Sequence, residues 1–346
     1  MVTSNTIRFV VLSALLMQTV SITSVIVEWE LKKICGKKLL YMGDHHDTPC
    51  FASLEKEQLY CFVNELEKYS LTNESPVHIQ IEHLSNVDLS NSNENLLTHL
   101  IDNLSDKCLK NVTFENSETR AAVGCAEDIL RFISRETDCI DGKVNLSLIP
   151  PCLKRSSATQ SFYLTSVTVE DIKAEYELVI RSLEEKISLI EDNIVKKALL
   201  ESFSSAKKHY TNLVEYYFNY FEDRNNEPLV DLVQSELDIR PDYIKEFLKD
   251  IFEASGSFFE LTLFTGIFIH EAPFIITIAG ARHISRLNGI STHIPLRFRE
   301  TIDAKHDLSW SNNTLDEDIP VIQVSDFTFF EKRPEKVAVC SRCILF

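Results

Sequence analysis

Short runs of strand character separated by segments of helix length dominate the first 140 residues of this 346-residue chain. Residues 39–42, 77–81 and 111–115 have the character of strands, and residues 53–69, 94–109 and 119–136 that of helices. Alternating strands and helices are typical of a parallel sheet with helices on its faces. The sequence therefore predicts an α/β fold, with a mostly parallel sheet flanked by helices.

A long helical region interrupts this alternation. Apolar residues recur at steps of three and four from Ile172 onward, and Thr168 with Asp171 is typical of a helix N-cap. Further helices are predicted at 198–222, 228–238, 241–254 and 257–269, before a buried strand at 274–279. We therefore expect a single α/β domain over residues 24–330 with a helical insertion at about 168–256, followed by a tail at 331–346.

Weaker patterns complete the expected fold. Residues 27–34 resemble a short amphipathic helix with Gly36 at its C-cap, and residues 141–168 resemble a loop. Residues 321–324 are expected to add a last strand. Glycine is scarce, with 8 residues, which favours long helices over many tight hairpins.

Charge and cysteine content exclude some classes of protein. The chain has 52 acidic and 35 basic side chains, a formal net charge of -17, whereas binding to a phosphate backbone needs a basic surface. We therefore expect no nucleic-acid partner. The 9 cysteines lack the regular spacing of a disulfide framework, which predicts free, mostly buried thiols.

The two ends of the chain suggest conflicting locations. Residues 9–22 form an apolar run behind Arg8, which is typical of a secretory signal and predicts a leader at 1–23 in a secreted or periplasmic protein. A buried first helix is the alternative. Cys343 begins a C-terminal C-a-a-X pattern, and its prenylation would instead give a cytosolic or membrane-anchored protein. Because export and cytosolic prenylation exclude each other in most cells, the alternatives remain open.

Polar residues follow four of the predicted strands. The strand at 39–42 leads into a G-x-x-H motif that ends at His46, and the strand at 274–279 leads into a second that ends at His283. Glu82 follows the strand at 77–81, and Arg120 follows the strand at 111–115. Ligands of open α/β sheets bind beyond the carboxyl ends of the strands. These four side chains are therefore predicted to converge on one crevice.

Two mechanisms fit these residues. In the first, His46 is a general base that activates water, Glu82 orients it, and Arg120 or His283 stabilises the oxyanion. In the second, His46, Glu82 and His283, with Asp44 as a further ligand, bind a divalent Zn, Mn or Co ion that lowers the pKa of its water. A serine or cysteine nucleophile has no support, because the chain contains no G-x-S-x-G motif.

The stretch LLYMGDHHDTP, the later IEH and the late IAGARHISRLNGI resemble motifs of the superfamily that includes TIKI/TraB, ChaN-like and erythromycin-esterase-like proteins. The resemblance implies a parallel-sheet core, a hydrolytic site in several branches, metal dependence in the TIKI branch and haem binding in ChaN. By that resemblance, His46 and Glu82 match the opening histidine and the central glutamate, and His283 matches the closing histidine. Asp44 stands where the opening motif usually has glutamate, so its reach toward a metal is shorter.

Together these patterns predict a hydrolase that activates water and cleaves an ester or peptide bond in a small-molecule or peptide substrate. The alternative from a different class is a protein that binds haem or another apolar ligand. A catalytically inactive secreted interaction protein is a further alternative.

Overall fold

The computed structural model describes residues 24–46, 52–82, 100, 104–107, 109–137, 144–157 and 160–305. The strands are β1 (Ser24–Ile34), β2 (Lys37–His46), β3 (Val77–Ile81), β4 (Val112–Asn116), β5 (Lys154–Ser156), β6 (Ser161–Tyr163), β7 (Phe274–Gly280) and β8 (Arg299–Lys305). The α-helices are α2 (Ala52–Thr72), α4 (Ala121–Thr137), α5 (Val169–Leu189), α6 (Asn193–Leu213), α7 (Leu229–Leu237), α8 (Pro241–Ile269) and α9 (Ala281–Ser291).

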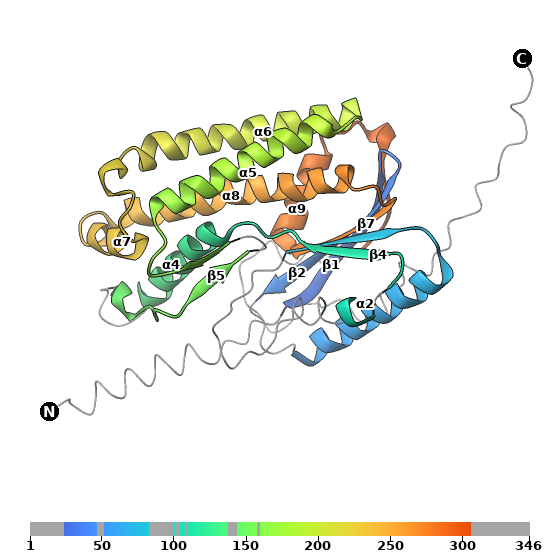
Figure 1. Ribbon diagram of the computed structural model, residues 1–346, viewed down its shortest axis with the longest axis horizontal. Coiled ribbons are helices and arrows are strands. Elements are labelled where there is room, and N and C mark those ends of the chain that lie inside the picture. The colour runs from blue at the N-terminus through green and yellow to red at the C-terminus, as the bar shows by residue number, and fades with distance from the viewer. Residues whose placement is uncertain are drawn as a thin grey trace, which may run out of the picture.

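Six of these strands form the main sheet, in the order β4-β3-β7-β2-β1-β8. The four strands β4, β3, β7 and β2 are parallel, and β1 is antiparallel to both of its neighbours. The late strand β7 lies between the early strands β2 and β3, so segments far apart in the sequence are neighbours in the sheet (Figure 1). The predicted α/β fold with a mostly parallel sheet is confirmed.

Helices cover both faces of the sheet. On one face, Phe62 and Leu66 of α2 pack against a layer that includes Leu40, Ile79 and Ile276. The residues that alternate with these along the strands face the other side, where α4, α5, α6, α8 and α9 supply a larger core. Figure 1 shows α5, α6 and α8 side by side along that second face. Burial on both faces explains why the central strand β7 is a nearly continuous apolar run in the sequence.

The predicted helical insertion is present and begins where its cap was expected. The Thr168 N–H donates to Asp171 at 2.9 Å, and the Asp171 N–H donates to the Thr168 hydroxyl at 3.1 Å. The helices predicted at 241–254 and 257–269 are one continuous helix, α8. The predicted break between these two helices, at Ser255 and Gly256, was wrong. Small residues within a helix also allow a neighbouring helix to pack closely. Here Gly256 lies against the side chains of α9.

The helix predicted at 27–34 was also wrong, because these residues belong to strand β1. Trp29 and Leu31 are buried on the α2 side of the sheet. Glu30 and Lys32 pair at 2.9 Å, as neighbours on one face of a strand can. Gly36 is not a helix C-cap. Cys35, with φ 47°, and Gly36, with φ 87°, are the two residues of a tight turn. Two consecutive positive φ values are the signature of a tight hairpin turn that joins β1 to β2.

Other differences concern less regular segments. The region predicted as a loop at 141–168 contains the small β5–β6 hairpin, and strand β8, which pairs with β1, was not predicted. The sequence of β8, RETIDAK, has no apolar run to identify it. The leader at 1–23, the strand at 321–324, Cys343 and most of the helix at 94–109 lie outside the described residues.

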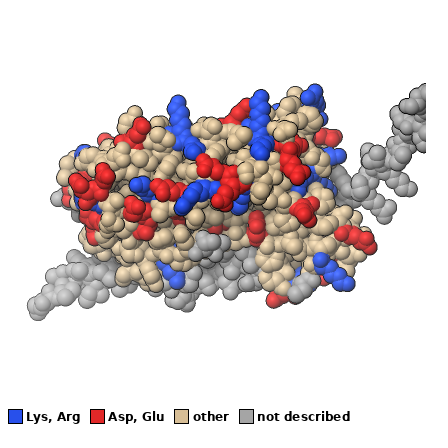
Figure 2. Space-filling model, turned by 45° about the horizontal axis from the view of Figure 1, so that its top comes forward, with Lys and Arg blue, Asp and Glu red and all other residues tan. Residues whose placement is uncertain are grey.

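Within the described part of the chain, α8 is long and apolar enough to cross a membrane, and 67% of its most apolar stretch is buried inside this fold. A core helix has the same character. On the face seen in Figure 2, acidic and basic side chains are interspersed and form no one-signed field. This surface fits the ordinary solvated faces of helices.

Candidate active site

Three parallel strands bring polar residues together at their carboxyl ends. Asp44 of β2 is in register with Gly280 of β7, and Asp44 is only 1% exposed. On the other side of β7, the Glu82 N–H donates to the Ile278 carbonyl at 2.9 Å. The Glu82 carboxylate in turn accepts from the Gly280 N–H at 2.8 Å. Asp44 and Glu82 therefore flank the end of the central strand.

Arg120 lies at the centre of this group. Its Nε and Nη2 donate to the two oxygens of Glu118 at 2.9 and 2.6 Å, a bidentate pairing. Nη2 also donates to Glu82 Oε1 at 2.6 Å, and Nη1 lies 3.3 Å from His283 Nε2. The guanidinium stacks 4.0 Å from the ring centre of Phe259. Arg120 thus joins the ends of β3 and β4 to the start of α9.

His283 lies in the first turn of α9, directly after β7, and its Nδ1 is 2.9 Å from Glu260 Oε1 on α8. A guanidinium can only donate hydrogen bonds. His283 Nε2 must therefore accept from Arg120, which assigns the proton of the neutral ring to Nδ1, where it is donated to Glu260. The same Nε2 is 3.5 Å from Glu82 Oε1, so a protonated ring would face a carboxylate.

The site is a buried ion network with an excess of acid. Burial alone would lower the pKa of Arg120, but the charges of Glu118 and Glu82 outweigh it and raise that pKa above its ordinary value. Glu118 is 0% exposed and Arg120 is 7% exposed. A charge pair in such a place is strongly coupled, and removing one partner leaves the other uncompensated. Arg120 therefore stays cationic and holds the surrounding carboxylates in place.

Of the residues predicted from the sequence, the structure brings Glu82, Arg120 and His283 into contact, with Asp44 on the neighbouring strand. His46 ends β2, where its backbone is in register with Ser24 of β1. Its side chain lies outside the described side chains, so the role of His46 stays a prediction.

Two carboxylates were not assigned a role from the sequence. Glu118 precedes Arg120 by two residues and binds it, and Glu260 orients His283 from 23 residues away. The sequence does distinguish Glu260, because it is the one charged residue in the apolar stretch 257–269. A lone charge in a buried helix requires a partner. That requirement could have pointed to His283.

A metal ion in a protein is held by several His, Cys, Asp or Glu side chains that point to one centre. Among the described residues, no group of three or more His, Cys, Asp or Glu side chains is arranged to hold one. The oxygens of Glu82 face Arg120 and the Gly280 N–H, and the nitrogens of His283 face Glu260 and Arg120. A guanidinium thus occupies the place where a cation would sit between Glu82 and His283. These side chains do not fit a metal as they lie, and ligation that includes His46 stays a prediction.

Fold and site together define an α/β protein with a mostly parallel sheet and a buried His–Arg–carboxylate network at the carboxyl ends of its strands. No protein-family model, curated protein or solved structure matches the chain. The superfamily resemblance of the strand-end motifs therefore remains a prediction.

Proposed function

We propose that this protein is a hydrolase that cleaves an ester or amide bond, with His283 as the group that takes a proton from water. The observation that carries the proposal is the pair of His283 and Glu260 beside Arg120. Glu260 holds the Nδ1 proton at 2.9 Å, which leaves the Nε2 lone pair on the side of the guanidinium. A histidine oriented by a carboxylate is the usual arrangement for general base catalysis.

Arg120 is suited to stabilise the oxyanion. A guanidinium carries five N–H groups. Within the described part of the chain, hydrogen bonds account for one on Nε, two on Nη2 and one on Nη1. The second Nη1 N–H is the donor that the proposal assigns to the developing negative charge. A preorganised donor in a buried site stabilises such charge far better than water does.

The proposed reaction balances without a further reactant. A water that replaces the 3.3 Å contact between Arg120 Nη1 and His283 Nε2 passes its proton to Nε2 while its oxygen bonds to the carbonyl carbon, and the carbonyl oxygen becomes an oxyanion held by Arg120. The tetrahedral species then expels the alkoxide or amine, which takes the proton back from His283. Glu260 stabilises the transient imidazolium, and His46 remains a candidate for a second proton-transfer group at the end of β2.

The test is a panel of chromogenic esters and short peptides with the full chain and the His283→Ala variant. We expect His283→Ala to lower kcat by about 100-fold or more. His293→Ala is the matched control, because His293 also pairs with a glutamate, Glu201 at 3.4 Å, away from the site. This control should keep full activity.

Several outcomes would overturn the proposal. One is the absence of cleavage across the panel, and another is full activity in folded His283→Ala. Haem uptake with a shifted absorption band in an inactive protein would favour the ligand-binding alternative. Activity that is lost on chelation and restored by zinc would instead support the metal-dependent mechanism that includes His46.

A further inference from the structure

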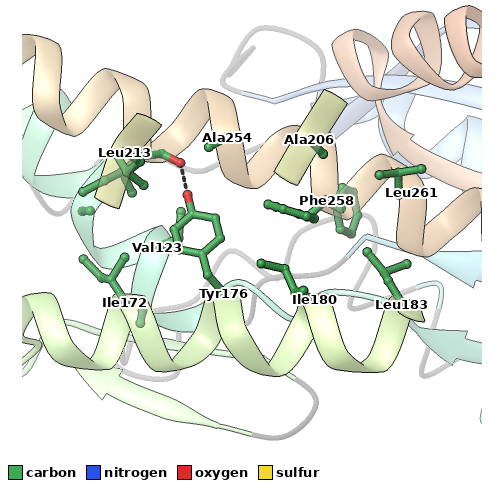
Figure 3. Close-up of a cluster of buried hydrophobic side chains, with 14 of the residues drawn as sticks. Val123, Ile172, Tyr176, Ile180, Leu183, Ala206, Leu213, Ala254, Phe258 and Leu261 are labelled. Carbon is green, nitrogen blue, oxygen red and sulfur yellow. Dashed lines mark hydrogen bonds between the residues drawn. The ribbon is translucent and has the colours of Figure 1, made fainter. Parts of the chain in front are cut away.

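Glu175 is a buried carboxylate of the helical insertion, and it contacts the start of α4. It lies on α5 and is only 4% exposed. In this fully described helix it is the one charged residue on a buried face formed otherwise by Val169, Ile172, Tyr176, Ile180, Leu183 and Ile187. The neighbouring Tyr176 hydroxyl donates to the Ile251 carbonyl of α8, which fixes this part of α5 in the core (Figure 3). A carboxylate in this position is costly unless it has partners.

The partners of Glu175 are backbone groups at the start of α4. Its two oxygens accept from the Ala122 N–H at 2.8 Å and from the Val123 N–H at 3.2 Å. The first N–H groups of a helix have no partner within the helix and favour negative charge. The first turn of α4 itself contains no acidic residue. Glu175 therefore supplies from α5 the acceptor that a local capping residue usually supplies.

The capped turn is directly joined to Arg120. Helix α4 begins at the next residue, and the Arg120 carbonyl accepts from the Gly124 N–H at 2.9 Å. The Arg120 N–H donates to Glu118 at 2.7 Å. The backbone of Arg120 is thus held on one side by Glu118 and on the other by the turn that Glu175 binds. A shift of that turn moves the base of the Arg120 side chain.

A small cavity also connects the two residues. Its volume is about 10 Å³, and its walls include Arg120, Glu175, Tyr176, Ser255 and Phe259. This is about the space of one water-sized sphere. Arg120 and Glu175 thus line one small cavity, and no ion pair joins them in the described part of the chain.

We propose that Glu175 is a positioning residue for this site, which fixes Arg120 through the first turn of α4 and so lets the helical insertion set the place of the guanidinium. The role rests on the proposed hydrolase function, in which Arg120 stabilises the oxyanion. It assigns the insertion a part in catalysis beyond packing.

Protonation of Glu175 near neutral pH is expected to change how firmly the first turn of α4 holds Arg120. Burial, with a smaller contribution from the charge of Glu118, raises the pKa of Glu175 to about 7, while the two backbone N–H groups and Arg120 oppose the shift. The groups that face this carboxylate are Glu118 and Arg120 near the sheet and Tyr176 on α5. A protonated Glu175 binds the α4 N–H groups more weakly. Arg120 is therefore expected to be held less firmly by the first turn of α4 as the pH falls through 7.

The test compares the wild-type chain with Glu175→Gln in steady-state hydrolysis between pH 6 and pH 8.5. At pH 8 we expect kcat to fall about 10-fold with KM unchanged, because a displaced catalytic group costs rate more than binding. At pH 6 the two proteins should converge, because the wild-type carboxyl is then protonated too. Asp192→Asn is the matched control, since Asp192 also accepts from two helix N–H groups, at 2.8 and 3.1 Å, but on α6. It should leave kcat and its pH profile unchanged.

Two results would overturn the inference: wild-type kcat in Glu175→Gln at pH 8, or the same loss in Asp192→Asn. If wild type hydrolyses nothing, the proposed function fails and NMR decides the inference separately. The buried Arg120 Nε–H donates to Glu118 and should exchange slowly with solvent. In Glu175→Gln its exchange should become about 10-fold faster, while unchanged exchange refutes the positioning role. If Glu175→Gln does not fold, Glu175→Asp, which shortens the reach, is measured in the same way.

Discussion

Gly266 offers a sharp test of how closely α8 lies to the sheet. A methyl group at Gly266 would lie 2.3 Å from Nε2 of Gln80 on β3, closer than such contacts allow. Gln80 is 1% exposed and accepts from the Thr277 hydroxyl at 3.1 Å, so it has little freedom to withdraw. Replacing glycine by alanine in a helix normally gains about 1 kcal/mol. Here that gain is opposed by about 1–3 kcal/mol of overpacking and about 1 kcal/mol for a lost hydrogen bond.

We therefore expect Gly266→Ala to lower the free energy of unfolding by about 1–3 kcal/mol. Gly289→Ala is the control, because Gly289 is also helical and a methyl group there meets nothing within 4 Å. That variant should gain about 0.5–1 kcal/mol. Urea denaturation at one pH measures both, and equal slopes with denaturant concentration show that the unfolded states are comparable.

The reasoning is refuted if Gly266→Ala is as stable as Gly289→Ala. Such a result would mean that α8 does not approach β3 as closely as described. Glu260 is carried by the same helix, so the contact of Glu260 with His283 would then need revision as well.

Three further predictions concern other buried groups. Arg120→Met leaves Glu118 buried without its counter-charge, so the free energy of unfolding in urea at pH 7 should fall by about 3–5 kcal/mol; a loss below 1 kcal/mol would argue against the ion network. The pKa of Glu175 is about 7 in the folded chain against 4.5 ordinarily, so its contribution to stability is complete below pH 4.5 and is lost as the pH rises through 7. The loss should amount to about 3 kcal/mol in urea titrations and be absent in Glu175→Gln, whereas equal pH slopes for both proteins would contradict it. Burial raises the pKa of the Cys125 thiol to about 12, so a thiol reagent should modify exposed Cys152 in the native protein and Cys125 only after unfolding, as peptide mass spectrometry can show.

The part of the fold that local pattern could predict is the part that is buried on both faces. β7 is a nearly continuous apolar run, β3 alternates apolar with polar residues and is buried throughout, and the cap of α5 lies within four consecutive residues, Thr168 to Asp171. β1 was misread because VEWELKKI fits one face of a helix as well as alternate faces of a strand. Its state is decided by pairing with β2 through a turn. β8 is charged and depends on β1 for its pairing, so its own residues do not reveal it.

The same distinction applies to the candidate site. The ends of parallel strands meet at one edge of a sheet, so the meeting of Glu82, Arg120 and His283 could be expected from strand order alone. The contacts that orient them come from helices whose packing the pattern does not specify. Glu260 reaches His283 across 23 residues, and Glu175 reaches Ala122 across 53. A long amphipathic helix predicts burial but does not predict which backbone group its one buried charge will meet.

The position of β7 between β2 and β3 has a consequence for biosynthesis. β2 and β3 are made within the first 81 residues, yet in the sheet both pair with β7, which is made after residue 273. The edges of β2 and β3 that pair with β7 thus stay without this partner strand while nearly 200 residues are synthesised. Long-range pairing of this kind is slow and leaves strand edges open in the meantime. A ribosome-bound chain stalled before β7 should therefore be protease-sensitive and depend on chaperones, and the sheet and its strand-end network should form together, late in synthesis.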